Sequence, residues 1–305
     1  MKRSAAQTRL AAALWLSFPQ VVLAAPPLAE PPVLIRDAAL GEISGCAASR
    51  AVPGRLWVHN DSGNPPFIYA LDTQGHVQAR VRLDGVVNLD WEDIAGFLWR
   101  GRPYLALADT GDNFAIRDSV AVLLLPEPDG SAATVRPERT IEVRYPDGPR
   151  DLESIAVDAA AGQILLLEKR RPPATLYAVA LDGPTRQTAR PIATLADWWP
   201  EPPTPSETIG DRRYRAAATA IDLSPDGRRL AVLSNTHWAV FTRADGESWQ
   251  TVLARRPSSV GRLPRRALPV HDTIFEALCW DPDGERLWIS GERLPAPLLP
   301  IAVPP

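Results

Sequence analysis

The sequence predicts an all-β protein, a five-bladed β-propeller, from three observations. A turn glycine followed by an apolar run and a polar residue recurs five times, at residues 54–61, 101–109, 162–169, 227–235 and 284–292. A second short run precedes each of them, and the openings of these runs are 50, 61, 66 and 57 residues apart. This period, with two strands and a turn per unit, is typical of propeller blades. The 32 prolines exclude long helices and favour short strands joined by loops.

The strands are predicted from short apolar runs bounded by Gly, Pro and Asp. A lone strand at residues 33–36 precedes the first repeat. Four blades follow, with strands at 42–47, 56–59, 67–71 and 77–83; at 93–98, 104–108, 119–125 and 140–144; at 154–158, 164–167, 175–181 and 192–195; and at 220–223, 230–234, 238–242 and 251–254. The proline-rich stretch 198–207 is predicted to be a loop.

The fifth blade contains only the runs 277–280 and 287–290 and a proline-broken tail at 298–302. Because this blade is one strand short, we expect the N-terminal strand to complete it and to close the ring without a free sheet edge. Six blades are the alternative, if one long connection holds a degenerate blade.

Residues 1–25 have the pattern of a secretory signal peptide, with Lys2, Arg3 and Arg9 ahead of an apolar stretch and small residues at its end. We therefore expect a secreted or periplasmic protein, a monomer, whose single propeller domain covers residues 26–305 and which has no membrane span after cleavage. Without this leader the chain has 30 basic and 36 acidic residues, a net charge of −6. That balance argues against nucleic acid as the main partner.

Two polar positions recur in the repeats, one opening the first strand of a blade and one following its second strand. Because these strands are antiparallel neighbours, both positions are predicted to meet at one mouth of the propeller. The candidate metal ligands at these positions are Glu42, Asp61, Glu92, Asp109, Glu153, Asn235, Glu276 and Glu292, and the same positions also hold Thr219 and Lys169.

Carboxylates crowded around this mouth are expected to attract positive charge. At about 6 Å and an effective dielectric near 20, two of them repel by roughly 3 kcal/mol. The ring should therefore bind a cation, hold protons or recruit basic side chains. Oxygen donors favour calcium over zinc. The alternative is that the acids cap strands, bind loop amides or pair with nearby basic side chains.

Other residues near the predicted mouth are candidates for holding a ligand. Arg170 and Arg171, beside Lys169, would suit an anion, or would form a solvated basic loop. His59 and His237 are either ligand-binding or packed strand residues. No Gly-x-Ser-x-Gly or His-Glu-x-x-His motif occurs, which gives nucleophilic catalysis little support.

The only two cysteines, Cys46 and Cys279, fall on equivalent strands of the first and fifth blades. These blades are neighbours in a closed ring, and the opposite parity of the two positions allows the side chains to face each other. The sequence leaves two possibilities, a disulfide that staples the closure or two buried thiols.

Several segments resemble motifs of secreted bacterial propellers of the SdiA-regulated and phytase-like (esterase-like) families. They are Glu-Ile-Ser-Gly at 42–45, Trp-Val-His-Asn-Asp-Ser-Gly at 57–63, Asp-Trp-Glu-Asp-Ile-Ala at 90–95, Gly-Asp-Asn at 111–113 and Asp-Leu-Glu-Ser-Ile-Ala at 151–156. The resemblance covers most of residues 40–170 and the repeats after 217. It implies a propeller of five or six blades, an extracytoplasmic location and calcium at the acidic positions. Thr219 departs from its glutamate pattern.

These patterns lead to two expected functions and a third alternative. The first is a propeller that binds calcium at its acidic mouth and a small anionic, sugar or peptide ligand through the flanking loops. The second is a calcium-dependent hydrolase of phosphoesters or lactones, with Glu92 or Glu153 as general base and Lys169 or Arg170 steadying the developing anion. The third is a protein-interaction scaffold.

Overall fold

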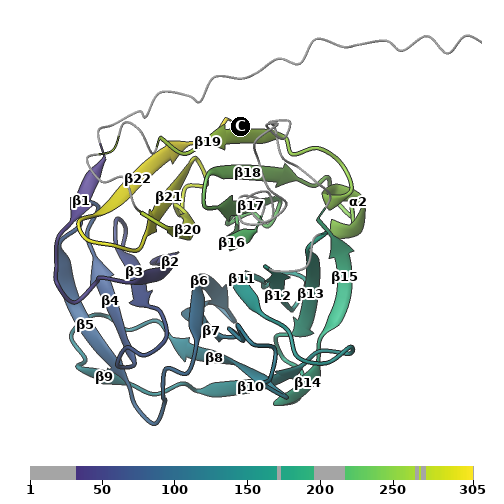
Figure 1. The fold of residues 1–305 in the computed structure, drawn as a ribbon, viewed down its shortest axis with the longest axis horizontal. Coiled ribbons are helices and arrows are strands. Elements are labelled where there is room, and N and C mark those ends of the chain that lie inside the picture. Colours follow the sequence, from purple (N-terminus) through teal and green to yellow (C-terminus); the bar gives the residue numbers. More distant parts are fainter. Residues whose placement is uncertain (1–31, 170–172, 196–216, 265–267, 269–272, 305) are drawn as a thin grey trace, which may run out of the picture.

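Five β-sheets stand in a ring around one axis in the computed structural model, which describes residues 32–169, 173–195, 217–264, 268 and 273–304 (Figure 1). The chain is therefore a five-bladed β-propeller, as the sequence predicts. The leader 1–25, the loop 198–207 and the candidates Arg170 and Arg171 lie outside the described residues. Within the described residues, no helix has the length and apolar character needed to cross a bilayer.

The strands of each blade run outward from the axis in chain order. Blade one contains β2 (Ile43–Ala48), β3 (Leu56–Asn60), β4 (Phe67–Leu71) and β5 (Val77–Leu83). Blade two contains β6 (Trp91–Trp99), β7 (Arg102–Asp109), β8 (Val120–Pro126) and β10 (Arg139–Arg144). Blade three contains β11 (Leu152–Asp158), β12 (Gln163–Glu168), β13 (Thr175–Ala180) and β15 (Arg190–Thr194). Blade four contains β16 (Ala218–Leu223), β17 (Arg229–Ser234), β18 (His237–Thr242) and β19 (Ser259–Arg262).

The N-terminal strand closes the ring in the predicted way. Blade five consists of β20 (Phe275–Trp280), β21 (Arg286–Gly291), β22 (Ala296–Ala302) and, as its outermost strand, β1 (Val33–Ile35). β1 pairs antiparallel with β22, so that Val33 lies opposite Leu298. The first and last strands of the described chain therefore share one sheet.

The five innermost strands contact one another around the axis, and small residues permit their close approach. A Cβ atom on Gly45 in β2 would lie 2.8 Å from the backbone nitrogen of Ile94 in the next blade. A Cβ atom on Gly96 would lie 2.6 Å from the carbonyl oxygen of Ala48. Larger side chains would push blades one and two apart. Apolar clusters fill the space between neighbouring blades, such as the one formed by blades three and four, which includes Leu165.

Two buried carboxylates also join the innermost strands. Asp93 in β6 accepts a hydrogen bond of 2.9 Å from the backbone nitrogen of Ile155 in β11. Asp222 in β16 accepts one of 2.8 Å from the backbone nitrogen of Trp280 in β20. Because each carboxylate supplies an acceptor to a neighbouring blade, these acids have a structural role.

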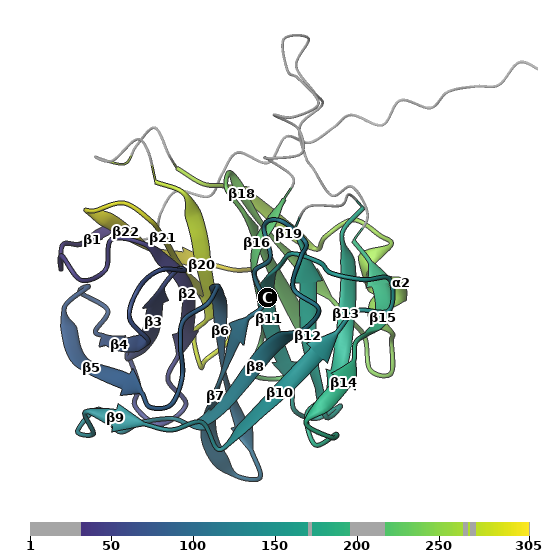
Figure 2. The same cartoon turned by 60° about the horizontal axis from the view of Figure 1, so that its bottom comes forward.

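Blades one and two each carry a fifth, outermost strand that comes from the following blade (Figure 2). β9 (Thr134–Val135) leaves the long connection between β8 and β10 and pairs parallel with β5. β14 (Arg186–Thr188) leaves blade three and pairs parallel with β10. Neither of these two strands was predicted from the sequence.

One predicted strand is wrong. Of the predicted strand 251–254, residues 251–253 belong to a short helix, α2 (Trp249–Leu253), and residue 254 caps its end; the outer strand of blade four is β19. Ser248 caps the helix by accepting a hydrogen bond from the backbone nitrogen of Thr251. Trp249, Val252 and Leu253 are buried. Their spacing suits one helical face, and it directs all three side chains into the core between blades three and four.

Candidate metal centre at the acidic mouth

Each blade has a register shift near the start of its first strand, where one residue is skipped in the pairing with the second strand. Such a bulge re-aims the side chain of the extra residue. The five skipped residues are Ser44, Glu92, Glu153, Thr219 and Glu276. In blade one the predicted position was Glu42, but the register gives Ser44, because Ile43 already pairs with Asn60.

The two hydroxyl residues among these five bind the neighbouring blade. Ser44 Oγ donates a hydrogen bond of 2.7 Å to the carbonyl oxygen of Glu92. Thr219 Oγ1 donates one of 2.8 Å to the carbonyl oxygen of Phe275. A hydroxyl residue at the bulge position thus forms a hydrogen bond to the next blade. The other three bulge positions hold glutamates, which are available for other roles.

The residues that follow the second strands lie at the same end of the propeller. In blades one, three, four and five they are Asp61, Lys169, Asn235 and Glu292, as predicted by counting. In blade two the register places Thr110 there instead of Asp109, because Asp109 still pairs with Trp91. Asp109 forms an ion pair of 2.7 Å with Arg117 and belongs to neither of the two groups of carboxylates described below, so its role as a metal ligand stays a prediction.

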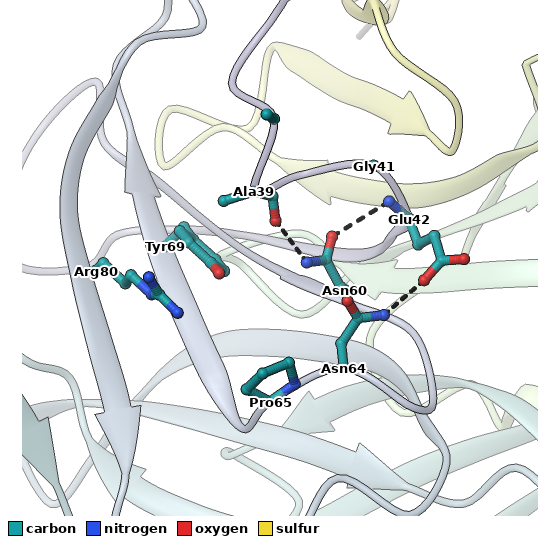
Figure 3. Close-up of a pocket in the computed structure, with 9 residues that line it drawn as sticks. Ala39, Gly41, Glu42, Asn60, Asn64, Pro65, Tyr69 and Arg80 are labelled. Atoms are coloured by element: carbon teal, nitrogen blue, oxygen red, sulfur yellow. Dashed lines mark hydrogen bonds between the residues drawn. The ribbon is translucent and has the colours of Figure 1, made fainter.

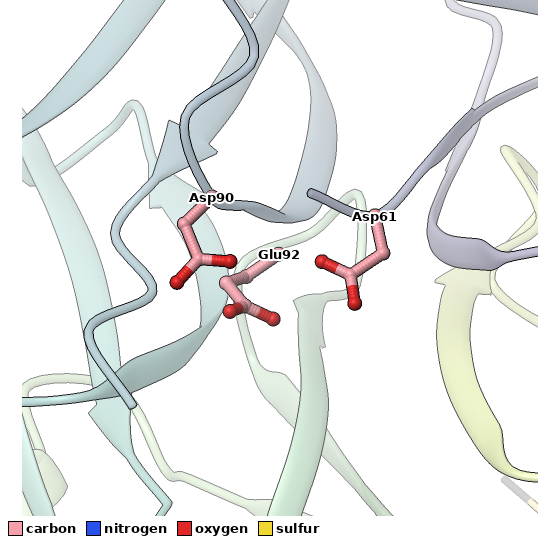
Figure 4. A group of neighbouring side chains, drawn as sticks. All are labelled: Asp61, Asp90 and Glu92. Atoms are coloured by element: carbon pink, nitrogen blue, oxygen red, sulfur yellow. The ribbon is translucent and has the colours of Figure 1, made fainter. Parts of the chain in front are cut away.

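Two groups of three carboxylates share Glu92. The first consists of Asp61, Asp90 and Glu92 (Figure 4), and the second of Glu92, Asp151 and Glu153; within each group the ligand atoms lie within 4.8 Å of one another. We call these residues together the acidic cluster. Asp90 and Asp151 were missed as ligands by the sequence analysis. The signal was available, since each stands two residues before a bulge glutamate, in Asp-Trp-Glu and Asp-Leu-Glu.

The space for these carboxylates depends on a residue that has no side chain. A Cβ atom on Gly111 would lie 2.0 Å from Glu92 Oε1 and 2.5 Å from Asp90 Oδ2. The backbone nitrogen of Gly111 also donates a hydrogen bond of 3.2 Å to the carbonyl oxygen of Asp90. The loop between β7 and β8 therefore packs directly against the first group of carboxylates.

Lys169 neutralises one side of the acidic cluster. Its Nζ atom lies 2.5 Å from Glu153 Oε2 and 3.4 Å from Glu276 Oε1. Burial would lower the pKa of Lys169, but the two glutamates raise it above its ordinary value, so the ammonium group stays charged. Burial raises the pKa of Glu153 and of Glu276 to about 7, although Lys169 opposes this shift.

On the other side of the cluster, no ion pair of this kind forms among the described residues. Among the ion pairs and hydrogen bonds of the described residues, none reaches the Glu92 carboxylate, although Glu92 is only 4% exposed. Burial raises its pKa well above the ordinary value, the carboxylates of Glu153 and Asp61 raise it further, and the charge of Lys169 opposes this shift. Burial also raises the pKa of Asp90 to about 6. In the absence of a cation, the charged form of Glu92 is therefore disfavoured.

The donor set fits a hard divalent cation. It consists entirely of carboxylate oxygens, supplied by two loops and by the start of β6, and one of them belongs to a buried group that has no hydrogen bond or ion pair among the described residues. Calcium takes six to eight such oxygens in flexible geometry, whereas zinc prefers nitrogen and sulfur. Asp61, Asp90 and Glu92 would hold the cation, with Asp151 close to the shared glutamate.

The remaining predicted ligands have other surroundings. Glu42 accepts a hydrogen bond of 2.6 Å from Asn64 Nδ2 at the edge of the cluster. Glu276 contacts Lys169. Burial raises the pKa of Glu292, and the charge of Asp61 raises it further. Asn235 is buried just after β17. The structure thus brings the acids together but divides them between the side with Lys169 and the side with Glu92.

Both candidate histidines are buried, and their role in ligand binding stays a prediction. His59 is buried, its ring meets Trp91 edge-on at 5.7 Å, and its Nδ1 atom lies 3.0 Å from the carbonyl oxygen of Asn60. Burial lowers its pKa to about 4, which keeps the ring neutral. His237 is buried as well, with Nδ1 2.9 Å from Thr236 Oγ1. Both are packed strand residues.

A pocket of about 440 Å³ lies beside the cluster, a size that suits a small molecule (Figure 3). Tyr69 and Arg80 form one wall, and Glu42, Asn60 and Asn64 another. The pocket and the cluster share a loop, since Asn64 Nδ2 donates a hydrogen bond of 3.2 Å to the carbonyl oxygen of Asp61.

Cys46 and Cys279 meet at the closure of the ring. Both are buried thiols on the neighbouring strands β2 and β20, and their Sγ atoms are 2.9 Å apart. The predicted facing of the first and fifth blades is therefore confirmed, while the disulfide itself stays a prediction.

Comparison with known proteins adds no family to this description. No protein-family model matches the chain, and a search of curated proteins gave no significant match. What the structure shows is a five-bladed β-propeller with an acidic cluster at one mouth.

Proposed function

We propose that this chain is an extracytoplasmic propeller that binds calcium through Asp61, Asp90 and Glu92 and holds a small anionic ligand beside it. One observation carries the proposal: Glu92 is buried, belongs to both carboxylate groups and has no partner among the described residues. Lys169 fills the corresponding role on the other side of the cluster, where it neutralises Glu153 and Glu276. A bound cation would neutralise Asp61, Asp90 and Glu92 in the same way.

The adjacent pocket supports the ligand part of the proposal. Arg80 lies over the Phe67 ring, 3.7 Å from its centroid, which orients a guanidinium group in the pocket wall beside Tyr69. Guanidinium groups are well suited to carboxylates and phosphates. A calcium ion on Asp61 would add positive charge on the side of the shared loop, so an anion is favoured over a neutral sugar or a peptide.

The extracytoplasmic location rests on the leader pattern of residues 1–25 and on the resemblance to secreted SdiA-regulated and phytase-like propellers. Calcium is abundant in such compartments, which fits the proposed ligand set. Expression with the leader, followed by fractionation and N-terminal sequencing, tests this point. A protein that remains in the cytoplasm with residues 1–25 attached would contradict it.

Calcium binding is tested by metal analysis of the purified protein and by thermal melts with chelator and with added calcium. Calcium should raise the Tm of the wild type, and Glu92→Gln should abolish the rise. Because a glutamine resembles the protonated glutamate, this variant should keep the stability of the metal-free fold. Glu285→Gln, the same change at an exposed turn, is the control. A wild-type Tm that is unchanged by calcium would reject the proposal.

A second candidate is a calcium-dependent hydrolase of phosphoesters or lactones. The pKa of about 7 at Glu153 favours it, since such a group can accept a proton near neutral pH. When bound, calcium would supply charge that polarises a substrate oxygen. Lys169, which contacts Glu153, is placed to steady a developing anion.

Turnover assays separate the hydrolase from a binding protein. A panel of phosphoesters and lactones is tested with calcium and with chelator, for the wild type and for Glu153→Gln. Hydrolysis that depends on both calcium and Glu153 supports the enzyme, and its absence leaves a binding protein. If neither calcium nor an anion binds, the remaining alternative is an interaction scaffold.

A further inference from the structure

Four exposed apolar side chains border the acidic cluster on two neighbouring loops. Val87 and Leu89, between β5 and β6, are 68% and 62% exposed, and Phe114 and Ile116, between β7 and β8, are 85% and 74% exposed. Of the five large hydrophobic residues of the described chain with this degree of exposure, only Leu98 lies elsewhere. We call Val87, Leu89, Phe114 and Ile116 the apolar rim.

The first loop is built so that its apolar side chains point outward. Asn88, between Val87 and Leu89, is buried, and its Nδ2 atom donates a hydrogen bond of 2.8 Å to the carbonyl oxygen of Asp61. Its Oδ1 atom accepts one of 3.1 Å from the backbone nitrogen of Trp91. This anchor leaves Val87 and Leu89 in solvent and brings the next residue, Asp90, into the cluster.

The second loop is anchored in a similar way. The carboxylate of buried Asp112 accepts hydrogen bonds from the backbone nitrogens of Ile116 at 2.9 Å and Arg117 at 2.8 Å. Ala115 has φ of 51°, a left-handed conformation that costs energy in a residue other than glycine. The exposure of Phe114 and Ile116 is thus held by a structured turn.

Hydrogen bonds join the two loops to each other and to the cluster. The backbone nitrogen of Gly111 binds the carbonyl oxygen of Asp90 at 3.2 Å, and that of Leu89 lies 3.4 Å from Asp109 Oδ2. The apolar rim and the proposed calcium ligands are therefore parts of one surface. Grouped exposed apolar residues of this kind mark binding sites.

The geometry points to an anionic amphiphile as the ligand of this mouth, with its head group at calcium on Asp61, Asp90 and Glu92 and its alkyl chain across the apolar rim. This inference rests on the proposed calcium site. A single amphiphile is favoured over an anionic bilayer because Glu42, Asp61 and Asp151 place negative charge around the same end. A bilayer would meet that charge over a wide area, whereas one head group meets the cation.

The test compares two soluble probes, methyl phosphate and hexyl phosphate below its aggregation limit, by calorimetry on the purified protein with calcium. Hexyl phosphate should bind at least about tenfold more tightly, since burial of two of its extra CH₂ groups suffices for that factor. The double variant Phe114→Ser with Ile116→Ser should remove most of this chain-length preference. Leu98→Ser, at an apolar residue that is 54% exposed near the far end of β6, should leave it unchanged.

The outcomes separate the two proposals. If calcium alone does not bind, the proposed function fails. If calcium binds but both phosphates bind equally, the amphiphile is rejected while the calcium site stands. If the calcium-loaded protein instead co-sediments with phosphatidylserine vesicles and ignores hexyl phosphate, a membrane surface replaces the amphiphile as the occupant.

Discussion

The Glu92 carboxylate occupies space that a side chain at Gly111 would need, since a Cβ atom on Gly111 would lie 2.0 Å from Glu92 Oε1. We therefore expect Gly111→Ala to displace the carboxylates of Glu92 and Asp90. It should lower calcium affinity by at least about tenfold and the free energy of unfolding by about 1–3 kcal/mol. Calorimetry and urea unfolding measure the two effects. Gly41→Ala, where a Cβ atom meets nothing within 4 Å, is the matched control. Wild-type affinity in Gly111→Ala would show that the cation binds elsewhere.

Removal of the Lys169 charge should destabilise the protein. Lys169→Met leaves Glu153 and Glu276 without their ammonium partner, and we expect a loss of about 2 kcal/mol at neutral pH, discounted for partial exposure. Added calcium should restore part of this loss, because the freed Glu153 belongs to the second carboxylate group. Urea unfolding with calcium and with chelator measures both effects. Lys169→Arg, which keeps the charge, should be affected less, and an undiminished stability in Lys169→Met would contradict this electrostatic account.

The hydroxyl groups at the bulge positions should contribute to stability independently of the cation. Thr219→Val removes the hydrogen bond to the carbonyl oxygen of Phe275 with little change of shape, at an expected cost of about 1 kcal/mol. Thr242→Val, at an exposed hydroxyl pair, should cost less. Denaturant melts give these differences, and calcium titration should show the same affinity in both variants. A change in affinity in Thr219→Val alone would assign this hydroxyl to the metal centre.

Asp222 makes stability depend on pH. Burial raises its pKa from 3.8 to about 6 in the folded protein. Since the folded state holds this proton more tightly than the unfolded state, the contribution of Asp222 is fully present below about pH 4 and is lost as the pH rises through about 6. Asp222→Asn should therefore show a smaller fall in the free energy of unfolding between about pH 4 and about pH 7 than the wild type. Urea unfolding with chelator across this range tests it, and equal slopes in both proteins would contradict it.

Cys46 and Cys279 are predicted to form a disulfide when the protein matures in an oxidising compartment. The two thiols would lose two protons and two electrons to a disulfide-bearing oxidant and form one S–S bond across the ring closure. Such a bond closes a long loop and should add up to about 5 kcal/mol in the chain-entropy model. Intact mass should be lower by two hydrogen atoms than after reduction. Alkylation of both thiols in unfolded, unreduced protein would show that they remain free, and Cys46→Ala with Cys279→Ala should be insensitive to reductant.

Local signals account for the parts of the fold that the sequence predicts correctly. Five turn glycines with positive φ each stand just before a second strand whose apolar run is visible in the sequence: Gly54, Gly101, Gly162, Gly227 and Gly284. β9 and β14 could not be found this way, because each is only two or three residues long and depends on pairing with another blade. Residues 251–254 were misassigned because a short apolar run fits a strand as well as one turn of helix.

The gathering of acids at one mouth was predicted in outline, and the differences in detail have separate causes. Glu92, Glu153 and Glu276 follow from the repeat, but Asp90 and Asp151 lie in loops before the strands, where strand counting does not reach. The count along β7 started at Tyr104, one residue before the position equivalent to the starts used in the other blades. It therefore ended at Asp109, one residue too early. Lys169 neutralises the carboxylates that lie within a few ångströms of it in the folded protein. The sequence does not give these distances, so it could not show which acids have a basic partner.

β9 pairs in parallel with β5, and β14 pairs in parallel with β10. One sequence repeat therefore does not contain all the strands of its own sheet. Excising blade three would strip blade two of its border strand, and shortening the β8–β10 connection would do the same to blade one. Attempts to build smaller or larger rings from this chain should therefore keep β9 together with blade one and β14 together with blade two.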